Sequence, residues 1–191
     1  MDAVEKCIHA LTTAKFTFEQ AVPIVPNDPG IYALHGSPET WARLGIGPPP
    51  DDRPLYVGKS EKSLRQRPLG QHFGHRIRVG SRTTSMTGSL AALLADELGL
   101  SPCPRNVHKP GYFDRFGLED DGDAKLTNWM RANLSTSFWK SDGITSLAVL
   151  EEKVCQRLMP PLNCEIATTW CDVVIRARKQ MSNATRAWCA R

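Results

Sequence analysis

The sequence lacks the segments and cysteine patterns that mark membrane, secreted or zinc-stabilised proteins. No apolar run among its 191 residues approaches the roughly 20 needed to span a bilayer. The first six residues have neither the basic start nor the apolar block of a signal peptide. The six cysteines form no C-x-x-C pair, and none of the five histidines completes a zinc spacing. We therefore expect a cytoplasmic protein without membrane contact, whose cysteines are small buried residues or free thiols.

Repeats, low-complexity tracts and clear linkers are also missing, which argues against an array of domains. Hydrophobic residues make up 41% and charged residues 23%, as in ordinary globular proteins, and the length suits one domain with a core. We expect an N-terminal cap segment at 1–26 and a main domain at 27–165 that carries an insertion at 74–133. A C-terminal helix at 166–191 should pack on this domain.

Positive charge is concentrated in one stretch of the chain, between residues 53 and 82. This stretch has one acidic residue, Glu61, and includes His72 and His75. Its eight basic residues are Arg53, Lys59, Lys62, Arg65, Arg67, Arg76, Arg78 and Arg82. Such a patch suits a polyanion such as nucleic acid, whose phosphates supply most non-specific affinity. A solvated basic face without a partner explains the charge equally well.

Two short apolar runs frame the central stretch, Gly30-Ile31-Tyr32 at one end and Tyr56-Val57-Gly58 at the other. Their β-branched and aromatic content, bounded by turn-forming residues, predicts two strands, most simply paired antiparallel. Tyr32 and Tyr56 would then lie about 5 Å apart if directly opposed. The glycines would let a substrate backbone approach, and Lys59 beyond them completes a possible phosphate site.

Apolar periodicity and turn-forming residues predict the remaining elements. The expected helices cover 4–11, 61–67, 87–98, 123–134 and 170–188, with a helical turn at 41–44, a loop at 101–123 and a third strand at 134–140. Gly99 is a plausible C-cap and Asp123 a plausible N-cap. On the last helix we expect Val173, Val174 and Ala177 to face inward, and Arg176, Arg178, Lys179 and Arg186 to face outward.

A helix that begins after Thr145 or Ser146 carries the most informative carboxylate. Its apolar face consists of Leu147, Leu150, Val154 and Leu158. At about 100° per residue, Glu151 falls inside or at the edge of this stripe, whereas Glu152 faces water. Because an unpaired carboxylate is costly to desolvate, Glu151 calls for a metal ion or an arginine partner. The alternative is a side chain that reaches from the edge of the stripe into a surface salt bridge.

Taken in order, these pieces resemble the GIY-YIG nuclease family. The matching residues are Gly30-Ile31-Tyr32, Tyr56-Val57-Gly58-Lys59, Ser63-Leu64-Arg65-Gln66-Arg67 followed by His72, Leu150-Glu151 and Pro160-Pro161-Leu162-Asn163. The resemblance covers roughly 28–73 and 134–164. It implies an α/β (α+β) fold with a small three-stranded antiparallel sheet flanked by helices, and a metal-dependent DNA endonuclease of the restriction or repair type.

The resemblance also implies roles for individual residues. Glu151 would hold the divalent ion, Mg²⁺ or Mn²⁺. Tyr32 would help deprotonate the attacking water, Tyr56 would orient that water or the phosphate, and Arg67 would stabilise charge on the phosphoryl oxygens. His72 would assist proton transfer, and Asn163 would brace the site. Gly30, Gly58, Lys59 and Arg65 would contact the substrate, which is double-stranded or branched DNA.

The residue types suit this chemistry independently of the resemblance. A phenol with a pKa near 10 is a poor base unless a cation such as Lys59 or Arg67 lowers that pKa. A guanidinium binds phosphate in a bidentate way, and a hard metal ion on a carboxylate activates water.

Several alternatives stay open from the sequence. Arg65 competes with Arg67, and His75 competes with His72. Lys59 either tunes a tyrosine or binds DNA, and the chain is a monomer or a homodimer. A nucleic-acid-binding module that keeps the fold but does not cut is the main competing function.

Overall fold

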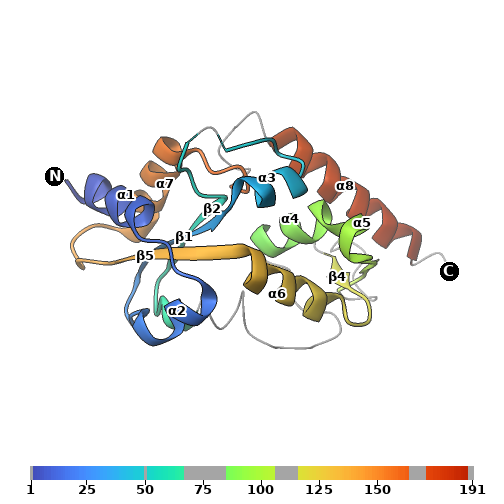
Figure 1. Ribbon diagram of the computed structural model, residues 1–191, viewed down its shortest axis with the longest axis horizontal. Helices are drawn as coiled ribbons and strands as arrows, with labels where there is room; N and C mark the ends of the chain where they lie inside the picture. Colours follow the sequence, from blue (N-terminus) through green and yellow to red (C-terminus); the bar gives the residue numbers. More distant parts are fainter. Residues whose placement is uncertain (1, 50, 67–84, 106–115, 164–170, 189–191) are drawn as a thin grey trace.

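The computed structural model describes residues 2–49, 51–66, 85–105, 116–163 and 171–188. A three-stranded antiparallel sheet lies at its centre, as the sequence predicts (Figure 1). Its strands are β1 (Gly30–Gly36), β2 (Tyr56–Ser60) and β5 (Leu134–Lys140), in the order β2-β1-β5. The central strand is therefore the one that carries Gly30 and Tyr32.

The register of the sheet differs in one respect from the simplest expectation. Tyr32 pairs with Gly58, and Tyr56 pairs with Leu34, so the two tyrosines are diagonal neighbours rather than directly opposed. Their ring centroids are 6.1 Å apart. This two-residue offset places Gly58 beside Tyr32, where it bears on the candidate site.

The two faces of the sheet are covered by different helices. Ile31 and Ala33 point to the face where α1 (Ala3–Thr13) and α7 (Leu147–Leu158) pack. Tyr32 and Leu34 alternate with them and point into a larger core on the other face. That core is built largely by α3 (Pro38–Arg43), α4 (Ser85–Leu93), α6 (Gly122–Asn133) and α8 (Cys171–Trp188).

Local capping explains several helix boundaries. Asp2 and Glu5 form a capping box at the start of α1. Thr17 and Gln20 form another at α2 (Phe18–Ile24), and this helix contains Pro23. The predicted C-cap is confirmed, since Gly99 ends α5 (Ala95–Leu98) with φ at 59°. Within the described residues, no helix is both long and apolar enough to cross a membrane.

The chain departs from the sequence predictions at several places. The expected 87–98 helix is broken at Leu94 into α4 and α5. The expected loop at 101–123 contains a short hairpin of β3 (Pro102–Cys103) and β4 (Gly117–Leu118). α6 begins at Gly122, so Asp121 rather than Asp123 occupies the N-cap position. Arg178 is half-buried and donates a hydrogen bond to Ser89, so it does not simply face outward.

A further departure follows β2, where the expected 61–67 helix has not begun at Glu61. The Ser60 hydroxyl donates to the Ser63 carbonyl and accepts the Ser63 amide, which closes a turn instead of a helix. The Ser63 hydroxyl then accepts the Gln66 amide, a cap for a turn that starts at Leu64. Side-chain capping has therefore moved the start of this turn by about three residues.

Candidate active site

Tyr32 and Tyr56 converge over Gly58 on one face of the sheet. Tyr32 is 0% exposed and Tyr56 is 9% exposed, and both belong to the larger core. A Cβ added to Gly58 would lie 2.8 Å from the Tyr32 hydroxyl oxygen and 2.8 Å from Tyr56 Cε1. The tyrosine rings therefore already occupy the space above this glycine.

Gly30 is constrained in the same way from a different direction. A Cβ at this position would lie 2.2 Å from the Trp139 carbonyl oxygen and 2.7 Å from Leu64 Cδ1. The substrate contact assigned to both glycines stays a prediction, but the room that each missing Cβ leaves is not open to a substrate. The room is filled by the protein itself, and the glycines are required by internal packing.

The carboxylate of Glu151 reaches from α7 to β2. Its Oε1 accepts a hydrogen bond from the Lys59 amide at 3.1 Å, and its Oε2 lies 3.9 Å from the Lys59 ammonium. The Glu151 side chain remains 26% exposed. Lys59 is thus the partner that Glu151 needs at the edge of the apolar stripe, because it offers both its backbone amide and its side-chain ammonium.

Lys59 alternates with Gly58 along β2, so it points away from the tyrosine face. Its ammonium lies 3.2 Å from Glu61, as well as near Glu151. The strand therefore presents two adjoining groups: tyrosines on one face, and the Lys59–Glu151 pair beside the other. Sequence periodicity alone did not reveal that Lys59 and Glu151 meet.

Asn163 holds the outer edge of the same strand. Its side-chain oxygen accepts the Val57 amide at 2.9 Å, and its side-chain nitrogen donates to the Val57 carbonyl at 2.8 Å. The Leu162 amide donates to the Leu55 carbonyl at 2.9 Å. Together with Glu151, these contacts satisfy the free edge of β2 with groups that follow or belong to α7.

The remaining predicted residues divide between placed and undescribed positions. Arg65 is exposed, and its guanidinium makes a 3.4 Å contact with the Val22 carbonyl. Arg67, His72 and the alternative His75 lie outside the described residues. The structure thus forms two groups along β2: Tyr32, Tyr56 and Gly58 meet on one face of the sheet. Lys59, Glu151 and Asn163 lie at the outer edge of the strand.

The donor set at Glu151 fits a magnesium-type ion. Over the part of the chain that the structure describes, no three His, Cys, Asp or Glu side chains gather to hold a metal. A partly exposed carboxylate suits Mg²⁺, which is commonly bound through one or two carboxylates together with water and substrate phosphates. A softer ion that needs several nitrogen or sulfur ligands is not matched by these residues.

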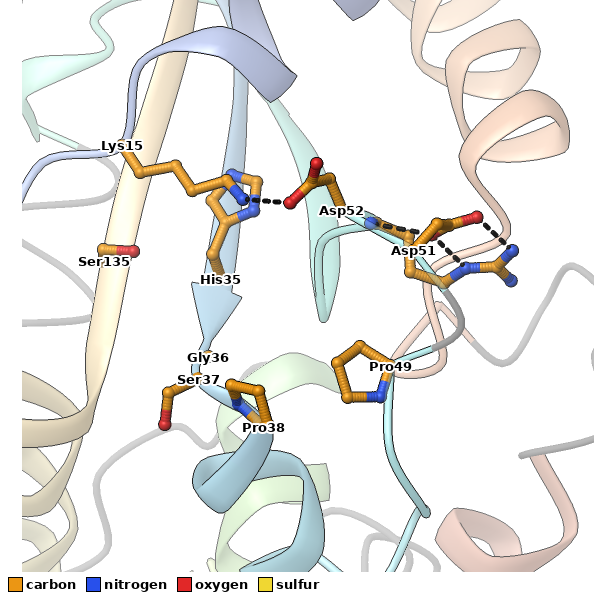
Figure 2. A pocket seen from close by; sticks show the side chains of 10 residues that line it. Lys15, His35, Gly36, Ser37, Pro38, Pro49, Asp51, Asp52 and Ser135 are labelled. Carbon is orange, nitrogen blue, oxygen red and sulfur yellow. Dashed lines mark hydrogen bonds and ion pairs between the residues drawn. The ribbon is translucent and has the colours of Figure 1, made fainter.

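A separate pocket of about 460 Å³ lies at the far end of β1 (Figure 2). It contains none of the predicted site residues. Its lining is Lys15, His35, Gly36, Ser37, Pro38, Pro49, Asp51, Asp52, Arg53 and Ser135. The four charged residues form two ion pairs, Lys15 with Asp52 at 3.2 Å and Arg53 with Asp51 at 2.8 Å.

His35 is the buried titratable group of this pocket, and sequence reasoning did not single it out. It is 3% exposed, and its Nε2 lies 2.8 Å from the Ser137 hydroxyl. Because that hydroxyl donates to the Leu11 carbonyl, His35 must donate through Nε2–H. Burial, together with the nearby Lys15 charge, lowers the pKa of His35 to about 4, so the ring is neutral at pH 7.

Comparison with known proteins gives one family match. Residues 51–184 match the family described as GIY-YIG catalytic domain, which is more than two thirds of the chain. The matched range contains β2, α7 and Asn163, and it begins after β1. No curated protein and no solved structure gives a significant match.

Proposed function

The chain belongs to the GIY-YIG family, whose members are generally nucleases, and from this premise we propose that it is a metal-dependent DNA endonuclease. The proposal is supported mainly by the position of the Glu151 carboxylate, which is held at the edge of the strand that bears Tyr56, Gly58 and Lys59. A restriction-type or repair-type enzyme fits this proposal.

The described residues include several groups that phosphodiester hydrolysis uses. Glu151 would hold Mg²⁺ or Mn²⁺, which when bound activates water and neutralises charge on the leaving oxygen. Lys59 lies beside Glu151, where its ammonium would attract the scissile phosphate. Asn163 fixes the backbone of Val57, so the neighbouring Tyr56 is held in place at the strand edge.

The two tyrosines would contribute differently. Tyr56, which is slightly exposed, would orient the water or the phosphate. Tyr32 is fully buried, so its hydroxyl must become accessible when DNA binds and must first lose its own proton, so that the phenolate oxygen can accept a proton from water. We retain Arg67 for charge stabilisation and His72 for proton transfer as proposals from the family resemblance.

The second candidate is a DNA-binding module of the same fold that does not cut. Lysine and arginine side chains suffice for a phosphate binder, whereas a carboxylate beside the phosphate would repel it. Glu151, set 3.9 Å from the Lys59 ammonium and partly exposed, therefore favours the nuclease.

Plasmid cleavage tests the proposal. Supercoiled plasmid is incubated with the protein and Mg²⁺, Mn²⁺ or EDTA, and nicked and linear forms are separated on a gel. The nuclease predicts cutting with either metal and none with EDTA. DNA binding without cutting under all three conditions, repeated with branched DNA, would instead support the binding module.

A further inference from the structure

α8 is an amphipathic helix at the outer edge of the molecule, at the opposite end from α1 (Figure 1). Val174, Met181 and Thr185 are buried on its inner side. The guanidinium of Arg178 donates to Ser89 of α4 at 3.1 Å, which adds a polar contact to this packing. The helix is thus anchored, and its outer side is presented in a fixed orientation.

The outer side of α8 carries a stripe of basic and amide side chains. At about 100° per residue, taking Arg176 as zero, Lys179, Asn183 and Arg186 fall near 300°, 340° and 280°. All four are exposed, and Arg186 donates a hydrogen bond to Asn183 at 3.0 Å. The stripe runs about 15 Å along the helix axis, at 1.5 Å per residue.

Charge on this helix is segregated, unlike charge on the other long helices. Asp172 is the one acidic residue between Cys171 and Trp188; it falls near 320°, on the same face, but one turn before Arg176, so the face carries one sign of charge from Arg176 onward. By contrast α1, α6 and α7 each mix acidic and basic residues. Within the described segments, no carboxylate pairs with Arg176 or Lys179.

The ordinary reasons for helix charge do not account for the stripe. The helix dipole favours Asp172 near the N-terminus and Arg186 near the C-terminus, but its effect fades within one turn. Arg176 and Lys179 lie beyond that turn. Solvated faces usually intersperse both signs of charge, whereas a single-sign stripe is typical of surfaces that meet a polyanion.

We propose that the stripe on α8, defined by Arg176, Lys179, Asn183 and Arg186, is a docking surface for the backbone of duplex DNA. This inference rests on the proposed function and assigns its substrate contact to a surface beyond the predicted site residues. Each strand of a duplex presents one phosphate per 3.4 Å of axis, so a 15 Å stripe spans several phosphates. A straight, anchored helix suits a duplex better than a flexible single strand.

The test compares Arg176→Gln/Lys179→Gln with wild-type protein. Binding to a duplex of about 20 base pairs is measured by fluorescence anisotropy in EDTA, over a series of salt concentrations. Losing two phosphate contacts should lower the slope of log affinity against log salt by about 2. We expect roughly tenfold or greater weakening at physiological salt, with an unchanged melting temperature.

Two further variants separate docking from general charge. Lys6→Gln/Lys125→Gln removes the same charge from exposed positions on α1 and α6, and should leave the slope nearly unchanged. Arg176→Lys/Lys179→Arg keeps the charges and should bind like the wild type. An unchanged slope in Arg176→Gln/Lys179→Gln, an equal loss in the control, or no duplex binding by the wild type would overturn the proposal.

The outcomes also distinguish this inference from the proposed function. If the wild type cuts DNA and Arg176→Gln/Lys179→Gln binds it as tightly as the wild type, the α8 docking surface is contradicted and the nuclease is not. Salt-sensitive binding through α8 by a protein that never cuts defeats the nuclease and leaves the docking surface standing.

Discussion

At Gly30 and Gly58 the missing side chain leaves space that other parts of the chain fill. The two glycines differ in what fills it. Gly30 faces a backbone carbonyl of β5 at 2.2 Å from a hypothetical Cβ, whereas Gly58 faces the rings of Tyr32 and Tyr56. A backbone group can move only if the strand pairing changes, while side-chain rings can shift within the core.

We therefore predict that Gly30→Ala destabilises the fold more than Gly58→Ala. Gly58→Ala should cost about 1–3 kcal/mol, as overpacking in a core does, and should reduce cleavage because it displaces both tyrosines. Gly30→Ala should exceed that cost, since it opposes the β1–β5 pairing. Urea unfolding measures both, and equal losses would contradict this distinction between the two glycines.

Tyr32 and Arg65 provide a second comparison between residues. Tyr32→Phe keeps the ring that packs over Gly58 but removes the hydroxyl, so stability should change by only about 1 kcal/mol. Loss of a proton-transfer group should slow cleavage by about a hundredfold or more. Arg65→Ala, which removes an exposed side chain, should slow it far less. Similar cleavage rates for the two variants would remove Tyr32 from its predicted role.

His35 makes stability depend on pH. Its folded pKa of about 4 lies below the ordinary value near 6.5, so between these values the unfolded chain binds the proton more strongly. The stabilising contribution is complete above pH 6.5 and is lost as the pH falls through 4, by an amount of about 3 kcal/mol. The charged groups that face His35 are Lys15 and Asp52.

His35→Gln isolates this effect, because the Gln amide can still donate to Ser137. Denaturant unfolding between pH 7 and pH 4 should show a shallower loss of stability for the variant than for the wild type. Parallel curves for both proteins would show that His35 does not titrate as its burial implies.

At the scale of elements, both edges of the sheet are covered by non-strand segments. Phe16 exchanges two backbone hydrogen bonds with Thr136 on β5, and Leu162, Asn163 and Glu151 bond the free edge of β2. Uncovered edges invite pairing with other chains, so these contacts protect a small sheet. On β2 the covering groups are also the proposed site residues.

Asn163→Ala should therefore weaken β2 locally. Loss of both bonds to Val57 should lower the free energy of unfolding by about 1–3 kcal/mol. By NMR hydrogen exchange, the Val57 amide should exchange faster, while amides of the central strand β1 keep their protection. Unchanged exchange at Val57 would mean that Asn163 does not hold this edge.

The sequence predicted elements well where one signal dominated. Strand composition and bounding turns located β1, β2 and β5, and apolar periodicity located α1 and α7. Predicted element boundaries were wrong where a side-chain hydroxyl took the place of a backbone hydrogen-bond partner, as Ser60 does with the backbone of Ser63 after β2. The two-residue β3 and β4 are too short to carry any periodic signal.

The candidate site was predictable only where a local sequence pattern marked a residue. Helical periodicity marked Glu151 as out of place among apolar residues, but its partner Lys59 is 92 positions away and emerged only from folding. The packing reason for Gly58 likewise depends on strand register, which the sequence leaves open. His35 gave no signal because its burial results from α1 and β5 together.

At the scale of the whole molecule, the sheet separates two cores, and the proposed cutting site lies along the β2 edge that α7 and Asn163 cover. α8, which packs on the larger core, would add a second contact with DNA. Binding and cutting should therefore depend on different residues, so that substitutions can separate the two.

Glu151→Gln tests the central claim most directly. The Gln oxygen can still accept the Lys59 amide, so folding should be preserved. Loss of the metal-binding charge should slow plasmid cleavage on the order of a thousandfold or more, equivalent to several kcal/mol. DNA affinity should stay the same or increase, because a negative charge near phosphate is removed. Cleavage at the wild-type rate by a folded Glu151→Gln protein would contradict the assignment of Glu151 as the metal ligand.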